Sequence, residues 1–124
     1  MSDDQPLRGR RILVVEDDYL VASALASLLE EAGASVVGPV GRADDALCLL
    51  EKEQDPVHAA ILDVDLHGQQ SYSVADALVQ RNIRFVFATG YAEEALDRRY
   101  QRYPRCQKPL DERTLLRALA STDA

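Results

Sequence analysis

The feature that most constrains the fold is a regular alternation of short aliphatic runs with longer segments of helical periodicity. The runs occupy residues 11–15, 35–37, 59–63 and 84–88, and a short fifth strand is expected at about 105–107. Helical segments follow at about 20–32, 42–52, 73–81 and 111–120, with only weak helical character over 91–103. Nearly continuous aliphatic runs are typical of parallel strands that are covered on both faces. Their alternation with helices predicts a parallel sheet with helices packed on both sides.

Pro39 indicates the order of the strands. A proline cannot donate a hydrogen bond to a neighbouring strand, so the second strand, which ends near Pro39, is expected at an edge of the sheet. Right-handed crossovers place the carboxyl ends of all five strands along one rim. We therefore expect a doubly wound, flavodoxin-like α/β fold, (βα)5, with a five-stranded parallel sheet in the order 2-1-3-4-5. In such a sheet, ligands bind where the strand order reverses.

Polar side chains stand directly after four of the five predicted strands. Glu16 and Asp17 follow the first strand, Asp63 ends the third, Thr89 follows the fourth and Lys108 the fifth, whereas Asp18 is interpreted as a helix cap. Three carboxylates at one rim repel one another, and a hard divalent cation such as Mg²⁺ relieves that repulsion. A phosphoryl group added to Asp63 could then be balanced by Mg²⁺, Lys108 and the Thr89 hydroxyl.

These residues resemble the receiver domain of bacterial two-component response regulators. The motifs that carry the resemblance are residues 12–18 (Ile-Leu-Val-Val-Glu-Asp-Asp), Leu62-Asp63, Ala88-Thr89-Gly90 and Lys108-Pro109, and the similarity extends from about Arg10 to Ala120. The resemblance implies that Asp63 accepts a phosphoryl group from a phosphohistidine of a histidine kinase or a histidine phosphotransfer protein. The chain is then a signalling domain rather than an enzyme.

The same resemblance implies roles for the rest of the rim. Mg²⁺ would be held by Glu16, Asp17, Asp63 and the backbone carbonyl of Asp65, and Thr89 and Lys108 would contact the phosphoryl group and take part in the switch. Many receivers carry an aromatic residue three positions before the lysine, where this chain has Arg105. Tyr91, which follows Thr89-Gly90, is the candidate for the substitute switch aromatic.

Residues 85–91, Phe-Val-Phe-Ala-Thr-Gly-Tyr, are more narrowly similar to the stand-alone "FATGUY" receivers. This similarity implies a single-domain regulator that acts on an unidentified downstream protein, an expectation in keeping with the absence of residues after Ala124. We expect a flexible N-terminus at residues 1–9, one receiver domain at 10–121 and a C-terminal tail at 122–124. Whether the chain forms a homodimer stays an open question.

Charge and hydropathy limit the partners and the location. The chain has 21 Asp and Glu against 14 Lys and Arg, a net charge of −7, which disfavours nucleic acid and anionic membranes as partners. No apolar stretch approaches the roughly 20 residues that span a bilayer. Residues 1–11 contain no apolar run of the kind found in signal peptides, so a cytoplasmic protein is expected.

Two other functions remain open. Asp63-Val64-Asp65 resembles the Asp-x-Asp motif of haloacid-dehalogenase-type phosphatases, which also form aspartyl phosphates with Mg²⁺. A domain that keeps the fold only to bind a partner, without phosphorylation, is the second alternative. Residues 97–105 are basic and aromatic and form either a solvated face or a protein-docking surface, because Tyr and Arg are favoured at interfaces.

Overall fold

The computed structural model describes residues 5–52, 54–66, 69–89, 97–107 and 111–120, with the backbone alone at residues 69, 70 and 89. Its main sheet is parallel and contains β1 (Arg11–Val15), β2 (Ser35–Val40), β3 (Ala59–Asp63), β6 (Arg84–Thr89) and β7 (Arg105–Gln107). The strands lie in the order β2-β1-β3-β6-β7. The predicted five-stranded sheet with the order 2-1-3-4-5 is therefore confirmed, and the strand that contains Pro39 lies at an edge.

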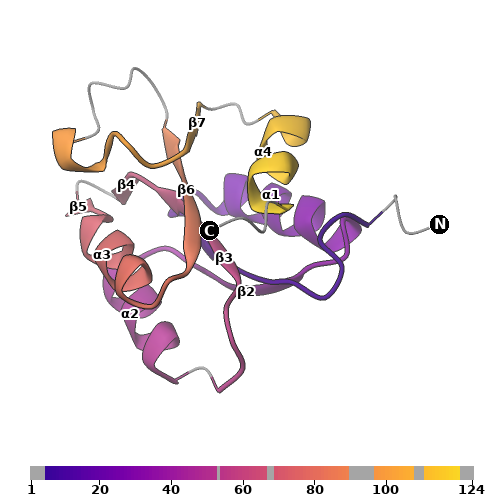
Figure 1. The fold of residues 1–124 in the computed structure, drawn as a ribbon, viewed down its shortest axis with the longest axis horizontal. Helices are drawn as coiled ribbons and strands as arrows, with labels where there is room; N and C mark the ends of the chain where they lie inside the picture. Colours follow the sequence, from indigo (N-terminus) through magenta and orange to yellow (C-terminus); the bar gives the residue numbers. More distant parts are fainter. Residues whose placement is uncertain (1–4, 53, 67–68, 90–96, 108–110, 121–124) are drawn as a thin grey trace.

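Helices cover both faces of this sheet. Figure 1 shows α1 (Tyr19–Glu31) and α4 (Glu112–Ala120) on one side, and α2 (Ala43–Lys52) and α3 (Tyr72–Gln80) on the other. Alternate residues of each strand point to opposite faces, so β1 contributes Leu13 to the core beneath α2 and α3 and Ile12 to the core beneath α1 and α4. The doubly wound α/β fold is confirmed.

The limits of α1 follow from residues at its two ends. The Asp18 side chain accepts hydrogen bonds from the backbone N–H groups of Leu20 at 2.9 Å and Val21 at 3.1 Å. It thereby satisfies donors that a helix start leaves unpaired, which confirms its interpretation as a cap. Gly33 follows the helix with a φ of +99°, and a Cβ there would lie 2.8 Å from the Arg8 Cα. Only glycine fits this helix end without strain.

The segment before β1 packs closely against the rest of the domain. Leu7 is fully buried in the core beneath α1 and α4, and its N–H donates to the carbonyl of Ala32 at 2.8 Å. Leu7 therefore belongs to the core, although it lies in the stretch expected to be flexible. Burial of one large aliphatic side chain contributes about 1.5–3 kcal/mol toward ordering such a segment.

Three local features differ from the predicted elements. β4 (Asp65–Leu66) and β5 (Gln69–Gln70) form a short antiparallel pair after β3, in a stretch for which no element was predicted. β2 continues beyond Val37 to Val40, so Pro39 lies inside the edge strand rather than at its end. Within residues 97–103, the structure has one short 3₁₀ turn, η3 (Arg98–Tyr100). Strands of two residues are too short to show an alternating pattern in the sequence.

Candidate functional site

The acidic site is built by the register of two neighbouring strands. Val15 of β1 pairs with Leu62 of β3, so Glu16, which follows β1, and Asp63, the last residue of β3, lie side by side. The Glu16 N–H donates to the carbonyl of Val40 at 2.9 Å, which ties the end of β1 to the edge strand. This is the position at which the order of the strands reverses, because β2 lies on one side of β1 and β3 on the other.

Three carboxylates converge at this point. Glu16, Asp17 and Asp63 each offer an oxygen, and these oxygens lie within 4.8 Å of one another. Glu16 is 3% exposed and Asp63 7% exposed, whereas Asp17 is half-buried. Burial of like charges at this separation is costly unless a cation or hydrogen-bond donors offset it. The structure thus brings together the three acidic side chains singled out in the sequence.

The donor set fits a small, hard cation. Oxygens bound to one Mg²⁺ lie at most about 4.2 Å apart, since each Mg–O distance is about 2.1 Å. A separation within 4.8 Å needs only a small side-chain adjustment to meet that limit. Carboxylate oxygens are also the ligands that Mg²⁺ prefers over those of softer metals. These three side chains could therefore hold Mg²⁺.

Backbone N–H groups orient two of the carboxylates. The Asp65 N–H donates to Asp63 Oδ1 at 3.3 Å, and the Asp18 N–H donates to Glu16 Oε2 at 3.1 Å. The Asp65 side chain is exposed. Both donors were missed from the sequence, because a backbone N–H is present at nearly every residue and leaves no pattern.

The remaining predicted site residues can be placed only in part. Asp63 pairs with Ala88 across β3 and β6, so the Thr89 backbone ends β6 at the same rim, but its side chain lies outside the described part of the chain. Gln107, the last residue of β7, pairs with Thr89. Lys108 and Tyr91 fall outside the described residues. Their roles stay predictions.

The fold and this cluster together define a flavodoxin-like α/β domain with an acidic pocket at its topological switch point. The family model of the response regulator receiver domain matches residues 12–120, and the chain belongs to this family. Domains of this family act in signalling, receive phosphoryl groups from kinases or phosphotransfer proteins, and bind Mg²⁺ at an acidic pocket.

Solved structures agree with this assignment. The solution structure of SdrG from Sphingomonas melonis Fr1 is 41% identical, with a TM-score of 0.79 over 90% of this chain and 93% of that one. The BeF3-activated conformation of SdrG from Pseudomonas melonis Fr1 is 40% identical, with a TM-score of 0.75 over 89% and 92%. The response regulator PhyR from Brucella abortus is 25% identical, with a TM-score of 0.74. That match covers 95% of this chain but 49% of PhyR.

Two comparisons are negative. Among curated proteins, none matches the chain. Among the described residues, no helix combines the length and the apolar character that crossing a bilayer requires.

Proposed function

We propose that this receiver domain is a Mg²⁺-dependent phosphoryl acceptor and that Asp63 is the accepting residue. A carboxylate oxygen of Asp63 attacks the phosphorus of a phosphohistidine on a histidine kinase or a phosphotransfer protein. A P–O bond forms, the P–N bond breaks, and the imidazole leaves as the electron pair returns to its nitrogen. We place this exchange in the cytoplasm, and its product, the aspartyl phosphate, switches a protein-binding surface.

Each rim residue has a part in this proposal. Glu16, Asp17, Asp63 and the backbone carbonyl of Asp65 would hold Mg²⁺, which when bound offsets charge on the phosphoryl oxygens. The backbone N–H of Asp65 keeps the Asp63 carboxylate in place before transfer. The Thr89 hydroxyl and the Lys108 ammonium would contact the phosphoryl oxygens, and Tyr91 would be the aromatic side chain that responds.

One observation carries the proposal: a carboxylate that is 7% exposed ends β3 within 4.8 Å of two others from the neighbouring strand end. Without a cation, repulsion within such a cluster lowers the stability of the fold. We therefore expect the cluster to serve a function. Membership in the receiver family supports phosphoryl transfer as that function.

The test uses the full chain with acetyl phosphate, a small phosphoryl donor, and Mg²⁺, and intact mass spectrometry measures the product. We expect one added phosphoryl group on the wild-type protein, none on Asp63→Asn, and none when EDTA removes the cation. Asp65→Asn is the matched control, because it removes an exposed carboxylate two residues away and keeps the backbone N–H that contacts Asp63.

Three results would contradict the proposal. Labelling of Asp63→Asn at the wild-type level would show that another residue is the acceptor. Labelling that is unaffected by EDTA would show that the reaction does not need the cation. Sustained turnover of a phosphomonoester that stops in Asp65→Asn would instead identify a phosphatase of the Asp-x-Asp kind.

A further inference from the structure

A groove lies between α3 and the segment of residues 97–103, on the side of the sheet that α2 and α3 cover. Its volume is about 360 Å³, and its walls include Asp76 and Val79 of α3 together with Arg99, Tyr100, Arg102 and Tyr103. In Figure 1, the orange segment that contains η3 lies beside α3. The acidic cluster of Glu16, Asp17 and Asp63 does not line this groove.

Tyrosine contacts hold the two walls of the groove together. The rings of Tyr72 and Tyr100 are stacked, with centroids 4.2 Å apart and an interplanar angle of 4°. The Tyr100 hydroxyl donates to Asp76 Oδ1 at 2.8 Å, and the Tyr72 hydroxyl accepts from the Asp97 N–H at 2.6 Å. Each bond joins α3 to the segment of residues 97–103, so the groove is formed before any partner arrives.

The segment of residues 97–103 presents positive charge to solvent. Arg98, Arg99 and Arg102 are exposed, and the guanidinium groups of Arg99 and Arg102 lie 5.1 and 5.0 Å from the ring centres of Tyr100 and Tyr103. Arg99 Nη2 donates to the Tyr100 hydroxyl at 3.3 Å, and Arg102 Nη2 donates to the Tyr103 hydroxyl at 3.0 Å. Stacking on a ring fixes the plane of each guanidinium, which has further N–H donors for a partner.

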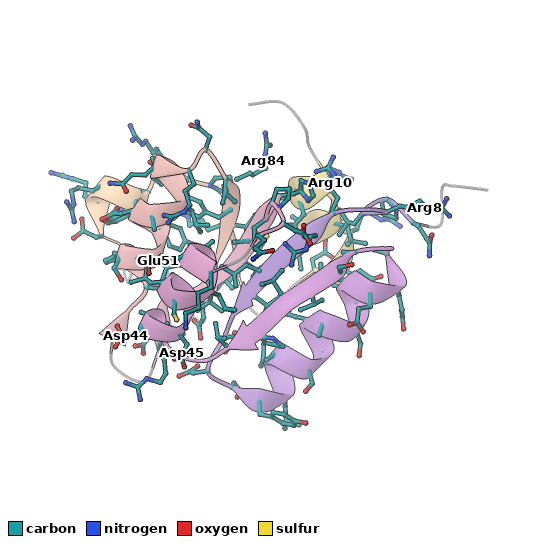
Figure 2. All side chains as sticks on the ribbon, turned by 90° about the horizontal axis from the view of Figure 1, so that it is seen from below. Arg8, Arg10, Asp44, Asp45, Glu51 and Arg84 are labelled. Carbon is teal, nitrogen blue, oxygen red and sulfur yellow. The ribbon has the colours of Figure 1, made fainter. Side chains whose placement is uncertain are left out.

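The nearby carboxylates are engaged within the domain. Asp97 Oδ1 accepts a hydrogen bond from the backbone N–H of Arg99 at 3.0 Å and lies 3.9 Å from Arg99 Nε, and Asp76 accepts from Tyr100. Figure 2 shows acidic side chains on another element, with Asp44 and Asp45 at the start of α2 and Glu51 farther along it. The chain as a whole is acidic, so an acidic partner is expected to be attracted to this positively charged groove.

We propose that this groove binds an acidic segment of a partner protein in which carboxylates flank an apolar side chain. The apolar side chain would pack on Val79, which is 41% exposed, and on the half-buried Tyr103, which also lines the groove. The flanking carboxylates would accept paired N–H groups from Arg99 and Arg102. An apolar centre inside a charged rim is the usual anatomy of a protein interface.

The inference deepens the proposed function, since it names the chemistry of the downstream partner, and it rests on that function only for the role of the groove in signalling. Binding is therefore measured without a phosphoryl donor. A failure of phosphoryl transfer to Asp63 would leave the binding result unchanged, and an empty groove would leave phosphoryl transfer intact.

The probe is a synthetic peptide with two leucines flanked by glutamates, and its reference is the same peptide with glutamine at every glutamate position. Each is titrated into the ¹⁵N-labelled full chain and followed by amide chemical shifts. We expect the acidic peptide to shift amides of residues 74–80 and 97–103 and to bind at least about tenfold more tightly than the reference. The double variant Arg99→Gln/Arg102→Gln should lose that preference.

The matched control is Arg113→Gln/Arg117→Gln, which removes the same charge from exposed positions of α4. This control should bind the acidic peptide as tightly as the wild type does. An equal loss of affinity in both double variants would mean that only the net charge of the protein matters. No shift at the groove at millimolar peptide, or equal affinity for the two peptides, would overturn the proposal. A dimer detected by sedimentation that only Arg99→Gln/Arg102→Gln abolishes would also overturn it, because the groove would then bind a second copy. Binding of a single-stranded oligothymidine in the groove more tightly than the acidic peptide would overturn it as well.

Discussion

The two faces of the sheet are packed with different kinds of side chain. The core beneath α1 and α4 is aliphatic apart from Cys106, with Leu29, Ile61 and Leu115 among its fully buried members. The core beneath α2 and α3 contains Phe85, Phe87 and Tyr100, and the rings of Tyr72 and Tyr103 pack against it. Of the described aromatic residues, only the exposed Tyr19 belongs to neither core.

This difference separates two tasks. An aliphatic core offers no hydrogen bonds and anchors α1 and α4 by burial alone. A tyrosine adds a hydroxyl to its buried ring, so it can pack in a core and still bond to a surface group. Tyr100 does both, because it is 4% exposed and donates to the exposed Asp76. The aromatic face thereby attaches an irregular segment, residues 97–103, that has little helical structure of its own.

The largest effect is expected from removing the ring at the centre of the aromatic face. Phe87 is fully buried and makes edge contacts with Phe85, Tyr72 and Tyr100. Phe87→Ala should lower the free energy of unfolding by about 3–5 kcal/mol, because it leaves a large cavity. Urea denaturation measures the loss, and near-ultraviolet circular dichroism should show that the tyrosines become less ordered.

Leu115→Ala is the matched substitution on the aliphatic face. Leu115 of α4 is fully buried in this core, and its truncation should cost about 2–5 kcal/mol. The near-ultraviolet signal of the tyrosines should persist at temperatures where this variant is still folded. If both variants disturb that signal equally, the two faces are not independent and the comparison fails.

The fold could be predicted from the sequence because its signals are local and repeated. Four of the five strands of the main sheet contain an apolar run, the exception being the short β7, and Asp18 and Gly33 mark the two ends of the first helix. The order of the strands needed one further fact, the proline in the second strand. The pair β4 and β5 was missed because strands of two residues show no alternating pattern, and the burial of Leu7 was missed because it depends on contacts with distant residues.

Of the candidate site, the structure describes only the acidic part and the backbone of Thr89, so the predictions for the Thr89 side chain, Lys108 and Tyr91 stay predictions. Glu16, Asp17 and Asp63 could be grouped because parallel strands end at one rim, and the structure brings their oxygens together. The groove could not be predicted as a shape. The sequence showed only that residues 97–105 are basic and aromatic, whereas the stacking of Tyr72 on Tyr100 joins positions 28 residues apart.

A smaller effect should follow the loss of one hydroxyl on the aromatic face. Burial, and then the hydrogen bond to Asp76, raise the pKa of Tyr100 above its usual value of about 10. A raised pKa means that folding favours the protonated phenol. This stabilisation is present below about pH 10 and is lost as the pH rises through the pKa of the folded state.

Tyr100→Phe tests this contribution. It keeps the ring and removes the hydrogen bond to Asp76, and should lower the free energy of unfolding at neutral pH by about 0.5–1.5 kcal/mol. Urea denaturation between pH 8 and about 11 should show a smaller alkaline loss of stability in this variant than in the wild type. Tyr19→Phe, at an exposed position, is the control and should follow the wild-type curve. If all three proteins lose stability equally as the pH rises, the ionisation of Tyr100 does not contribute to the alkaline loss.

The smallest effect is expected at the opposite pH limit and on the aliphatic face. Asp111 precedes α4, and its Oδ2 accepts hydrogen bonds from the hydroxyl and the N–H of Thr114. These bonds, the one from the hydroxyl first, lower the pKa of Asp111. A lowered pKa means that folding favours the carboxylate, so this stabilisation is present above about pH 3.9 and is lost as the pH falls through the folded-state value.

Asp111→Asn separates the cap from its charge, because asparagine also caps helices but does not titrate in this range. We expect near wild-type stability at pH 7 and a slightly smaller loss between pH 5 and 3, measured by urea denaturation. Asp44→Asn, at an exposed position in the first turn of α2, is the matched control on the aromatic face. Hydrogen exchange should show acid-induced opening of α4 in the wild type and in Asp44→Asn but less in Asp111→Asn. Equal opening in all three would mean that the α4 cap is insensitive to this charge, and acid sensitivity would then not distinguish the two faces.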